Sequence, residues 1–284
     1  MKLPLNLPKV LDAWKEASVK TERSASVVLA GDGRLVELAK NQFSVGGTVP
    51  ATWVDPIAEL SAFSSVPGEL LVILIPSVGE AEAEVFAAFE QALPRGGVVV
   101  AVDEGREATG KVTRPRRRLV RVSFSDSAAG WRRLFASCAE LAGDHAVALG
   151  RRYPALRTAA ARRVIDKTAG QNALIGLMFI LPGADMPAMT LNQIRMVLSI
   201  AGIYGEQIGM ERAVELAAVV GMGFGFRAFA RLLVRSIPGI GWVVKAVTGY
   251  TATLAVGLGA LRYFEKGAPA STSRVVALAS TLKP

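Results

Sequence analysis

The sequence of 284 residues contains a single cysteine and a single histidine. Disulfide frameworks need pairs of cysteines, and zinc sites built from cysteine and histidine need three or four such ligands, so both are excluded. A catalytic device that pairs a nucleophile with histidine would depend on His145 alone, and we expect this residue to lie on a solvated helix face. The first eight residues lack the apolar segment of a secretory signal. We therefore predict no metal site and a chain that begins in the cytoplasm.

Positive charge is concentrated in one part of the chain. Residues 1–110 carry 9 Lys or Arg against 15 Asp or Glu, whereas residues 111–167 carry 14 against 4. A basic segment of this kind binds nucleic acid, anionic lipid or an acidic partner. Binding to single-stranded nucleic acid favours aromatic side chains interleaved with the cations, and this stretch has few of them. Nucleic acid is therefore the least favoured of the three partners.

The N-terminal half contains short apolar runs separated by segments with helical periodicity. The runs predict strands at residues 26–30, 70–75, 98–102 and 119–124, and the periodic segments predict helices at residues 35–40, 80–93 and 128–150. Apolar strands that alternate with helices indicate a mostly parallel sheet covered on both faces. The predicted fold class of residues 1–150 is α/β, and a ligand would bind at the carboxyl ends of the strands.

The first turn between strand and helix lies where a nucleotide-binding P-loop would lie. A P-loop needs a glycine-rich loop that ends in Lys and then Ser or Thr, which hold the phosphates and Mg²⁺. Here the turn is short, and both of those residue types are missing. We predict the fold of a GTPase without hydrolysis, and no cofactor. Weak binding of GTP or another anion is the alternative, and its candidate residues are Gly31, Asp32, Gly33, Arg34 and, after the third strand, Asp103.

The C-terminal half contains two long runs without charge, at residues 168–184 and 246–261. A membrane-spanning helix needs about 20 such residues, with a lower limit near 17, so both runs are borderline. Ala255 and Gly259 have the spacing that lets helices approach closely in lipid. We expect contact with a membrane. Two buried helices in a soluble bundle are the alternative interpretation.

Several cations directly precede the first uncharged run. Lysine and arginine beside a membrane segment favour the cytoplasmic side and anionic lipid headgroups. The candidate lipid-facing residues are Arg151, Arg152, Arg157, Arg162, Arg163 and Lys167.

Short motifs in the C-terminal half resemble one known family. They are RYPALR at residues 152–157, TAGQNA at 168–173, PGADMP at 182–187, TLNQI at 190–194 and GFGFR at 223–227. Together they resemble the bacterial GTPase-associated helical domain of unknown function, the group that includes YcjF-like inner-membrane proteins, over residues 150–266. The resemblance implies a helical domain that embeds in or docks on a membrane, commonly joined to an Era-like GTPase domain. It implies no catalytic residues.

The sequence as a whole predicts a GTPase-like α/β domain at residues 1–150, a membrane-associated helical domain at 151–266 and a flexible tail at 267–284. The predicted function is that of a non-catalytic scaffold or regulator on the cytoplasmic face of a membrane, paired with an active GTPase or with a second copy of the chain. A divergent nucleotide-binding GTPase and a soluble two-domain interaction protein are the alternatives.

Overall fold

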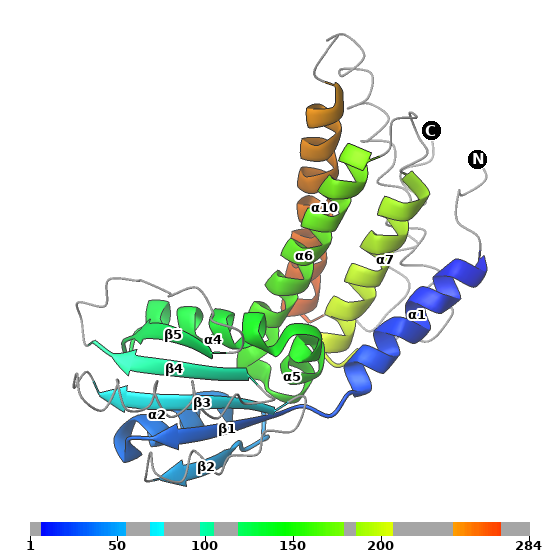
Figure 1. The fold of residues 1–284 in the computed structure, drawn as a ribbon. Helices are drawn as coiled ribbons and strands as arrows, with labels where there is room; N and C mark the ends of the chain where they lie inside the picture. Colours follow the sequence, from blue (N-terminus) through cyan, green and yellow to red (C-terminus); the bar gives the residue numbers. More distant parts are fainter. Residues whose placement is uncertain are drawn as a thin grey trace.

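The computed structural model describes residues 7–54, 69–76, 97–104, 119–178, 186–206 and 241–267, which form a parallel sheet and a group of helices (Figure 1). Five strands make the sheet: β1 (Ser26–Gly31), β2 (Ala51–Val54), β3 (Glu69–Pro76), β4 (Gly97–Asp103) and β5 (Leu119–Phe124). Their order is β2-β1-β3-β4-β5, and every neighbouring pair is parallel. The α/β prediction is confirmed, and this sheet is compatible with the predicted P-loop-like domain.

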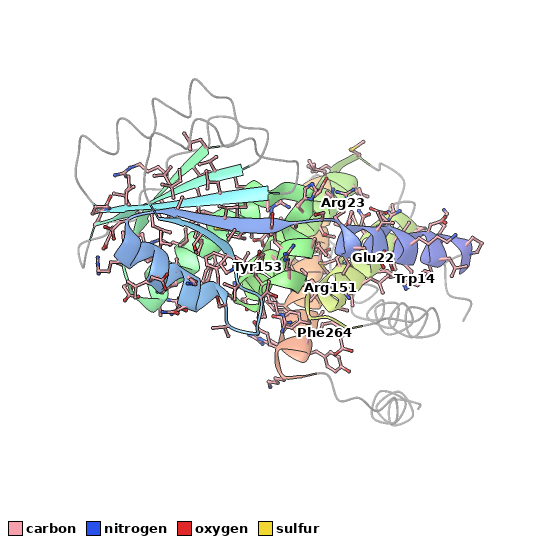
Figure 2. All side chains as sticks on the ribbon, turned by 90° about the horizontal axis from the view of Figure 1, so that it is seen from below. Trp14, Glu22, Arg23, Arg151, Tyr153 and Phe264 are labelled. Carbon is pink, nitrogen blue, oxygen red and sulfur yellow. The ribbon has the colours of Figure 1, made fainter. Side chains whose placement is uncertain are left out.

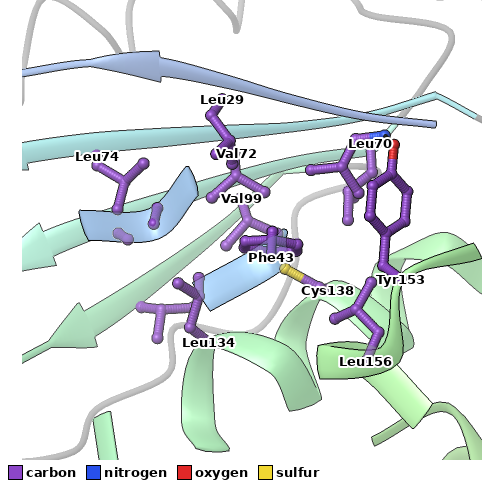
Figure 3. Close-up of a cluster of buried hydrophobic side chains, with 14 of the residues drawn as sticks. Leu29, Phe43, Leu70, Val72, Leu74, Val99, Leu134, Cys138, Tyr153 and Leu156 are labelled. Atoms are coloured by element: carbon purple, nitrogen blue, oxygen red, sulfur yellow. Dashed lines mark hydrogen bonds between the residues drawn. The ribbon is translucent and has the colours of Figure 1, made fainter. Parts of the chain in front are cut away.

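The central strands are buried on both faces, which explains why their sequences are apolar without alternation. One face includes Leu29, Val72 and Val99, and these residues share a core with α2 (Gly33–Phe43) and α4 (Ala128–Ala142) (Figure 3). Residues of opposite parity, such as Val28 and Ile73, are buried on the other face. The predicted helix at residues 80–93 lies outside the described part of the chain.

The helical segment predicted at residues 128–150 is divided in two. Helix α4 ends at Ala142, where Gly143 takes a φ of +60° that L side chains rarely adopt. A short turn of 3₁₀-helix then leads into α5 (Ala146–Arg152), and a second such turn spans Pro154–Leu156. His145 is half-buried in the first of these turns. The break lets α4 cover the sheet while α5 turns toward the other helices.

Four long helices form a second core beside the sheet (Figure 1): α1 (Leu7–Glu22), α6 (Arg157–Met178), α7 (Met186–Ile203) and α10 (Gly241–Glu265). Helix α10 packs along α6, and α1 packs along α7. Val10, Ala13 and Ala17 of α1 are buried in this core. The helical core therefore contains the N-terminal helix as well as helices from the C-terminal half.

Helix α5 joins the two cores. Ala146 and Val147 are buried with the helical group, whereas Ala148 and Leu149 are buried with the sheet. The first four residues of this seven-residue helix are apolar and can therefore be buried from both directions. The predicted domain boundary at residue 150 stays a prediction, but the chain near it is packed on both sides.

The two uncharged runs have different outcomes. Residues 246–261 lie inside α10, and residues 168–178 form the end of α6, while the remainder of that first run lies outside the described residues. Among the helices that the structure describes, none has both the length and the apolar character needed to cross a membrane.

Candidate functional site

The β1–α2 turn is much shorter than a phosphate-binding P-loop. One residue, Asp32, separates the end of β1 from the start of α2. Its carboxylate accepts a hydrogen bond from the Leu35 backbone N–H at 3.1 Å and so caps the helix. The helix terminus that would attract an anion is therefore already occupied by a negative charge of the chain itself.

The neighbouring strand β3 contacts the β1–α2 turn. In a sheet of this order, ligands bind in the crevice between the carboxyl ends of β1 and β3. Here the Asp32 N–H donates to the Leu74 carbonyl oxygen at 2.9 Å. Gly31 has a φ of +115°, and a Cβ at this residue would overlap that same carbonyl. The ladder between β1 and β3 therefore continues through Asp32, up to the start of α2.

The remaining predicted anion-binding residues form an ion pair on this rim. Arg34 donates to the Asp103 carboxylate at 3.1 Å, and the Arg34 side chain is 69% exposed. Glu104 lies next to this pair in the chain, accepts a hydrogen bond from Ser123, and pairs with Arg121 at 3.2 Å. The structure thus brings Gly31, Asp32, Gly33, Arg34 and Asp103 together, but each charged group among them has an intramolecular partner.

Two of the six predicted lipid-facing cations are paired with acids. Arg163 contacts the Glu140 carboxylate at 3.3 Å, and Lys167 contacts Asp144 at 2.9 Å. The hydrogen bond and charge of Lys167 lower the pKa of Asp144. Both cations line a cavity of about 190 Å³ between α1, α6 and α7, where Glu16 is a further acid. This cavity therefore holds charges of both signs.

Three others line a second cavity with a different character. Arg151, Arg152 and Arg157 surround a cavity of about 390 Å³ together with Arg23, which the sequence analysis did not select. Arg162, the sixth cation, is exposed on α6 and lines neither of these cavities. Figure 2 labels Arg23, Arg151 and Tyr153 in the region where the sheet meets the helices.

Tyr153 fixes this junction. Its side chain is 1% exposed, and its hydroxyl oxygen accepts a hydrogen bond from the Val27 N–H of β1 at 3.1 Å. Arg152 donates to the Ala25 carbonyl at 3.0 Å, and its guanidinium lies 5.7 Å from the centroid of the Tyr153 ring. Residues 152–157, the RYPALR motif, therefore connect the first strand to the helical core.

The predicted helix-packing pair and the single cysteine lie outside the two cavities and the β1–α2 turn. Ala255 and Gly259 lie on the exposed side of α10, and nothing lies within 4 Å of a Cβ built at Gly259. Cys138 is buried in the sheet core, and burial raises the pKa of its thiol. The described residues contain no group of three or more His, Cys, Asp or Glu side chains that could hold a metal ion.

The fold and the site define a chain in which a parallel α/β unit is joined to a group of helices through a basic junction. Residues 148–282, a little under half of the chain, match the model of a family described as a domain of unknown function (DUF697). The C-terminal part thus contains a domain of this kind, and its start coincides with α5 and the RYPALR motif. No curated protein and no solved structure matches the chain.

Proposed function

We propose that this protein is a non-catalytic scaffold or regulatory protein that docks on the surface of a membrane. The proposal that the protein is non-catalytic rests on the β1–α2 turn, in which Asp32 caps the helix and contacts Leu74. This turn ties the N–H groups of Asp32 and Leu35 to acceptors of the chain itself, and it has no Lys for phosphates. The α/β unit then serves as a rigid body for contacts with a partner, which we propose to be an active GTPase or a second copy of the chain.

A nucleotide titration tests this part. We expect GTP with Mg²⁺ to give no saturable, Mg²⁺-dependent binding to the full-length protein. A divergent GTPase would bind in this way and would lose the binding when Arg34→Ala removes the cation at the turn. Binding that requires Mg²⁺ and Arg34 would therefore overturn the non-catalytic proposal.

The membrane part rests on an exposed apolar tip where α6 ends and α10 begins. Large apolar side chains are exposed there on both helices: Leu174, Leu177, Met178, Val247 and Tyr250. The two ends adjoin, because a Cβ at Gly249 would lie 3.0 Å from the Asn172 carbonyl oxygen. Neighbouring exposed apolar residues of this kind mark surfaces that bind a membrane or another protein.

The spacing between the tip and the cations fits a single leaflet. Lys167 and Leu177 are ten residues apart on one helix, which corresponds to about 15 Å at 1.5 Å per residue. This is about half of the hydrocarbon thickness of a bilayer. A tip inserted into one leaflet would therefore place Lys167 and the exposed Arg162 near the headgroups. We propose insertion into one leaflet with anionic headgroups around the base of α6.

Vesicle flotation with the full-length protein tests the docking. We expect binding to vesicles that contain anionic lipid, and a loss of most of that binding when Leu174→Glu puts a charge into the tip. Val49→Glu is the matched control, because Val49 is also 59% exposed but lies beyond α2 in the α/β unit. Equal binding of wild type and Leu174→Glu, or no binding by the wild type, would contradict the proposal.

A further inference from the structure

The cavity between the sheet and the helices is lined by four arginines that come from three segments of the chain. Arg23 follows α1, Arg151 and Arg152 end α5, and Arg157 begins α6. The other polar lining residues are hydroxyl-bearing: Thr21, Ser24 and Thr48. Among the described residues that line it, none is an Asp or Glu. The nearest acid in the sequence, Glu22, is exposed at the end of α1 and is not part of the lining.

Four guanidinium groups around one cavity repel each other unless an anion lies between them. Two of them have no carboxylate partner among the described residues: Arg152 donates to a neutral carbonyl and lies over the Tyr153 ring, and Arg157 lies 5.8 Å from the centroid of the Tyr204 ring. The Nε atom of Arg157 is buried and has no hydrogen-bond acceptor among the described residues. A buried donor without an acceptor is costly, so the chain itself satisfies the Arg157 guanidinium only in part.

The shape of the cavity is fixed by close packing rather than by the arginines. On one side, Gly46 lies so near Pro154 that a Cβ at Gly46 would overlap the proline ring. On the other, Arg152 is tied to the Ala25 carbonyl beside the buried Tyr153. The loop after α2 and the start of α6 are therefore held at the two sides of the cavity before any ligand binds, which reduces the cost of binding.

We propose that this cavity binds a small phosphorylated molecule that carries two or more phosphate oxygens available to separate arginines, such as a diphosphate. Guanidinium groups match phosphate oxygens in pairs, and hydroxyl groups add further donors. A volume of about 390 Å³ suits a ligand of this size. Because the ligand would touch residues before β1, after α2 and on α5 and α6, its binding stabilises the junction between the two cores.

The ligand is soluble and not a headgroup of the membrane to which the protein docks. Arg157 and Leu177 lie at opposite ends of α6, twenty residues or about 30 Å apart. A tip inserted in lipid would hold the cavity well above the headgroup layer. This step rests on the proposed membrane docking, whereas the phosphate site itself does not.

Calorimetric titration of the full-length protein with pyrophosphate, without membranes, tests the site. We expect saturable binding that weakens at least tenfold in Arg151→Gln and in Arg23→Gln, because each removes one exposed guanidinium from the lining. Arg162→Gln removes an exposed arginine of α6 that lies outside the lining and should leave the affinity unchanged. No saturable binding, or an equal loss in all three variants, would overturn the proposal, since the latter indicates general charge attraction.

Two further measurements separate this site from its alternatives. Without ligand, Arg151→Gln should keep or raise the melting temperature because it relieves repulsion, and with pyrophosphate it should lose the upward shift shown by the wild type. A lowered melting temperature without ligand would contradict the repulsion on which the proposal rests. Anionic vesicles should not displace bound pyrophosphate, and displacement would overturn the assignment to a soluble ligand. Failure of the vesicle flotation would leave the pyrophosphate result unaffected.

Discussion

At the residue scale, Gly31 determines how closely β1 and β3 approach at the end of the sheet. Its φ of +115° is unfavourable for any residue with a Cβ, and that Cβ would overlap the Leu74 carbonyl oxygen. We expect Gly31→Ala to lower the free energy of unfolding by about 2–4 kcal/mol, measured by urea denaturation. Gly170→Ala in α6 is the control, because nothing lies within 4 Å of a Cβ built at this residue. Its free energy of unfolding should rise by up to about 1 kcal/mol. Equal effects would contradict the close approach.

Tyr153 acts through one atom as well as through its ring. Its hydroxyl oxygen accepts the Val27 N–H, and removing it leaves a buried backbone donor unpaired at the start of β1. We expect Tyr153→Phe to lower the free energy of unfolding by about 1–2 kcal/mol, measured by urea denaturation. The circular dichroism spectrum of the folded protein should change little. Tyr250→Phe on the exposed side of α10 should change stability by less than about 0.5 kcal/mol. An unchanged stability of Tyr153→Phe would show that this hydrogen bond does not hold the junction.

At the scale of single elements, α10 shows why the choice of helix face matters. The spacing of four between small residues was recognised in the sequence at Ala255 and Gly259, which are exposed. The same spacing at Gly249, Thr253 and Gly257 faces α6 and α7, and Thr253 accepts hydrogen bonds from Asn172 of α6 and Gln193 of α7. Two residues along a helix correspond to roughly 200° of rotation, so the predicted pair lies on the opposite side. Without a hydropathy contrast between the faces, the sequence could not distinguish them.

Two glycines of this helix, Gly257 and Gly259, give a matched pair of variants. A Cβ at Gly257 would lie 2.7 Å from Ile165 Cγ1 and 3.1 Å from Met196 Sδ, whereas a Cβ at Gly259 meets nothing within 4 Å. We expect Gly257→Ala to lower the melting temperature through a cost of about 1–3 kcal/mol. Gly259→Ala should raise it slightly, because alanine favours the helix by about 1 kcal/mol. The reverse order would mean that α10 packs on α6 through its other face.

The secondary structure could be predicted where a single local signal decides it. Four of the five strands follow from their apolar runs to within one residue at each end, because a strand buried on both faces needs apolar residues throughout. Strand β2 has four residues, lies at the edge of the sheet and has no such run.

The predicted anion-binding residues do meet at one rim, since parallel strands end on one side. Arg23 was missed because only the fold brings it to the arginines of α5 and α6.

At the scale of the whole molecule, the ion pair between Glu16 and Arg195 attaches α1 to α7. The hydrogen bond from Lys20 and the charge of Arg195 on α7 lower the pKa of Glu16 below its ordinary value of 4.5. A lowered pKa in the folded state stabilises the fold above the unfolded value and loses this contribution as the pH falls through the folded value. Glu16→Gln should therefore reduce stability at pH 7, and the difference from wild type should shrink as the pH falls from 4.5 through the lowered pKa of Glu16. A difference that does not depend on pH would contradict this role. Glu22→Gln at the exposed end of α1 is the control.

The two cores share α5 and Tyr153, and the N-terminal helix packs with the C-terminal ones, so the chain should unfold as one unit. Trp131 lies in the sheet core and Trp14 packs against the helical core, so each reports on one of them. Two variants, each with Trp14 or Trp131 as its sole tryptophan, allow each core to be followed by fluorescence. In each variant we expect the urea midpoint from fluorescence to equal the midpoint of global unfolding measured by circular dichroism. Two separate transitions within each variant would show independent domains. A single transition means that a ligand bound by the junction arginines stabilises both cores together, because neither core can unfold without breaking the surface that holds the ligand.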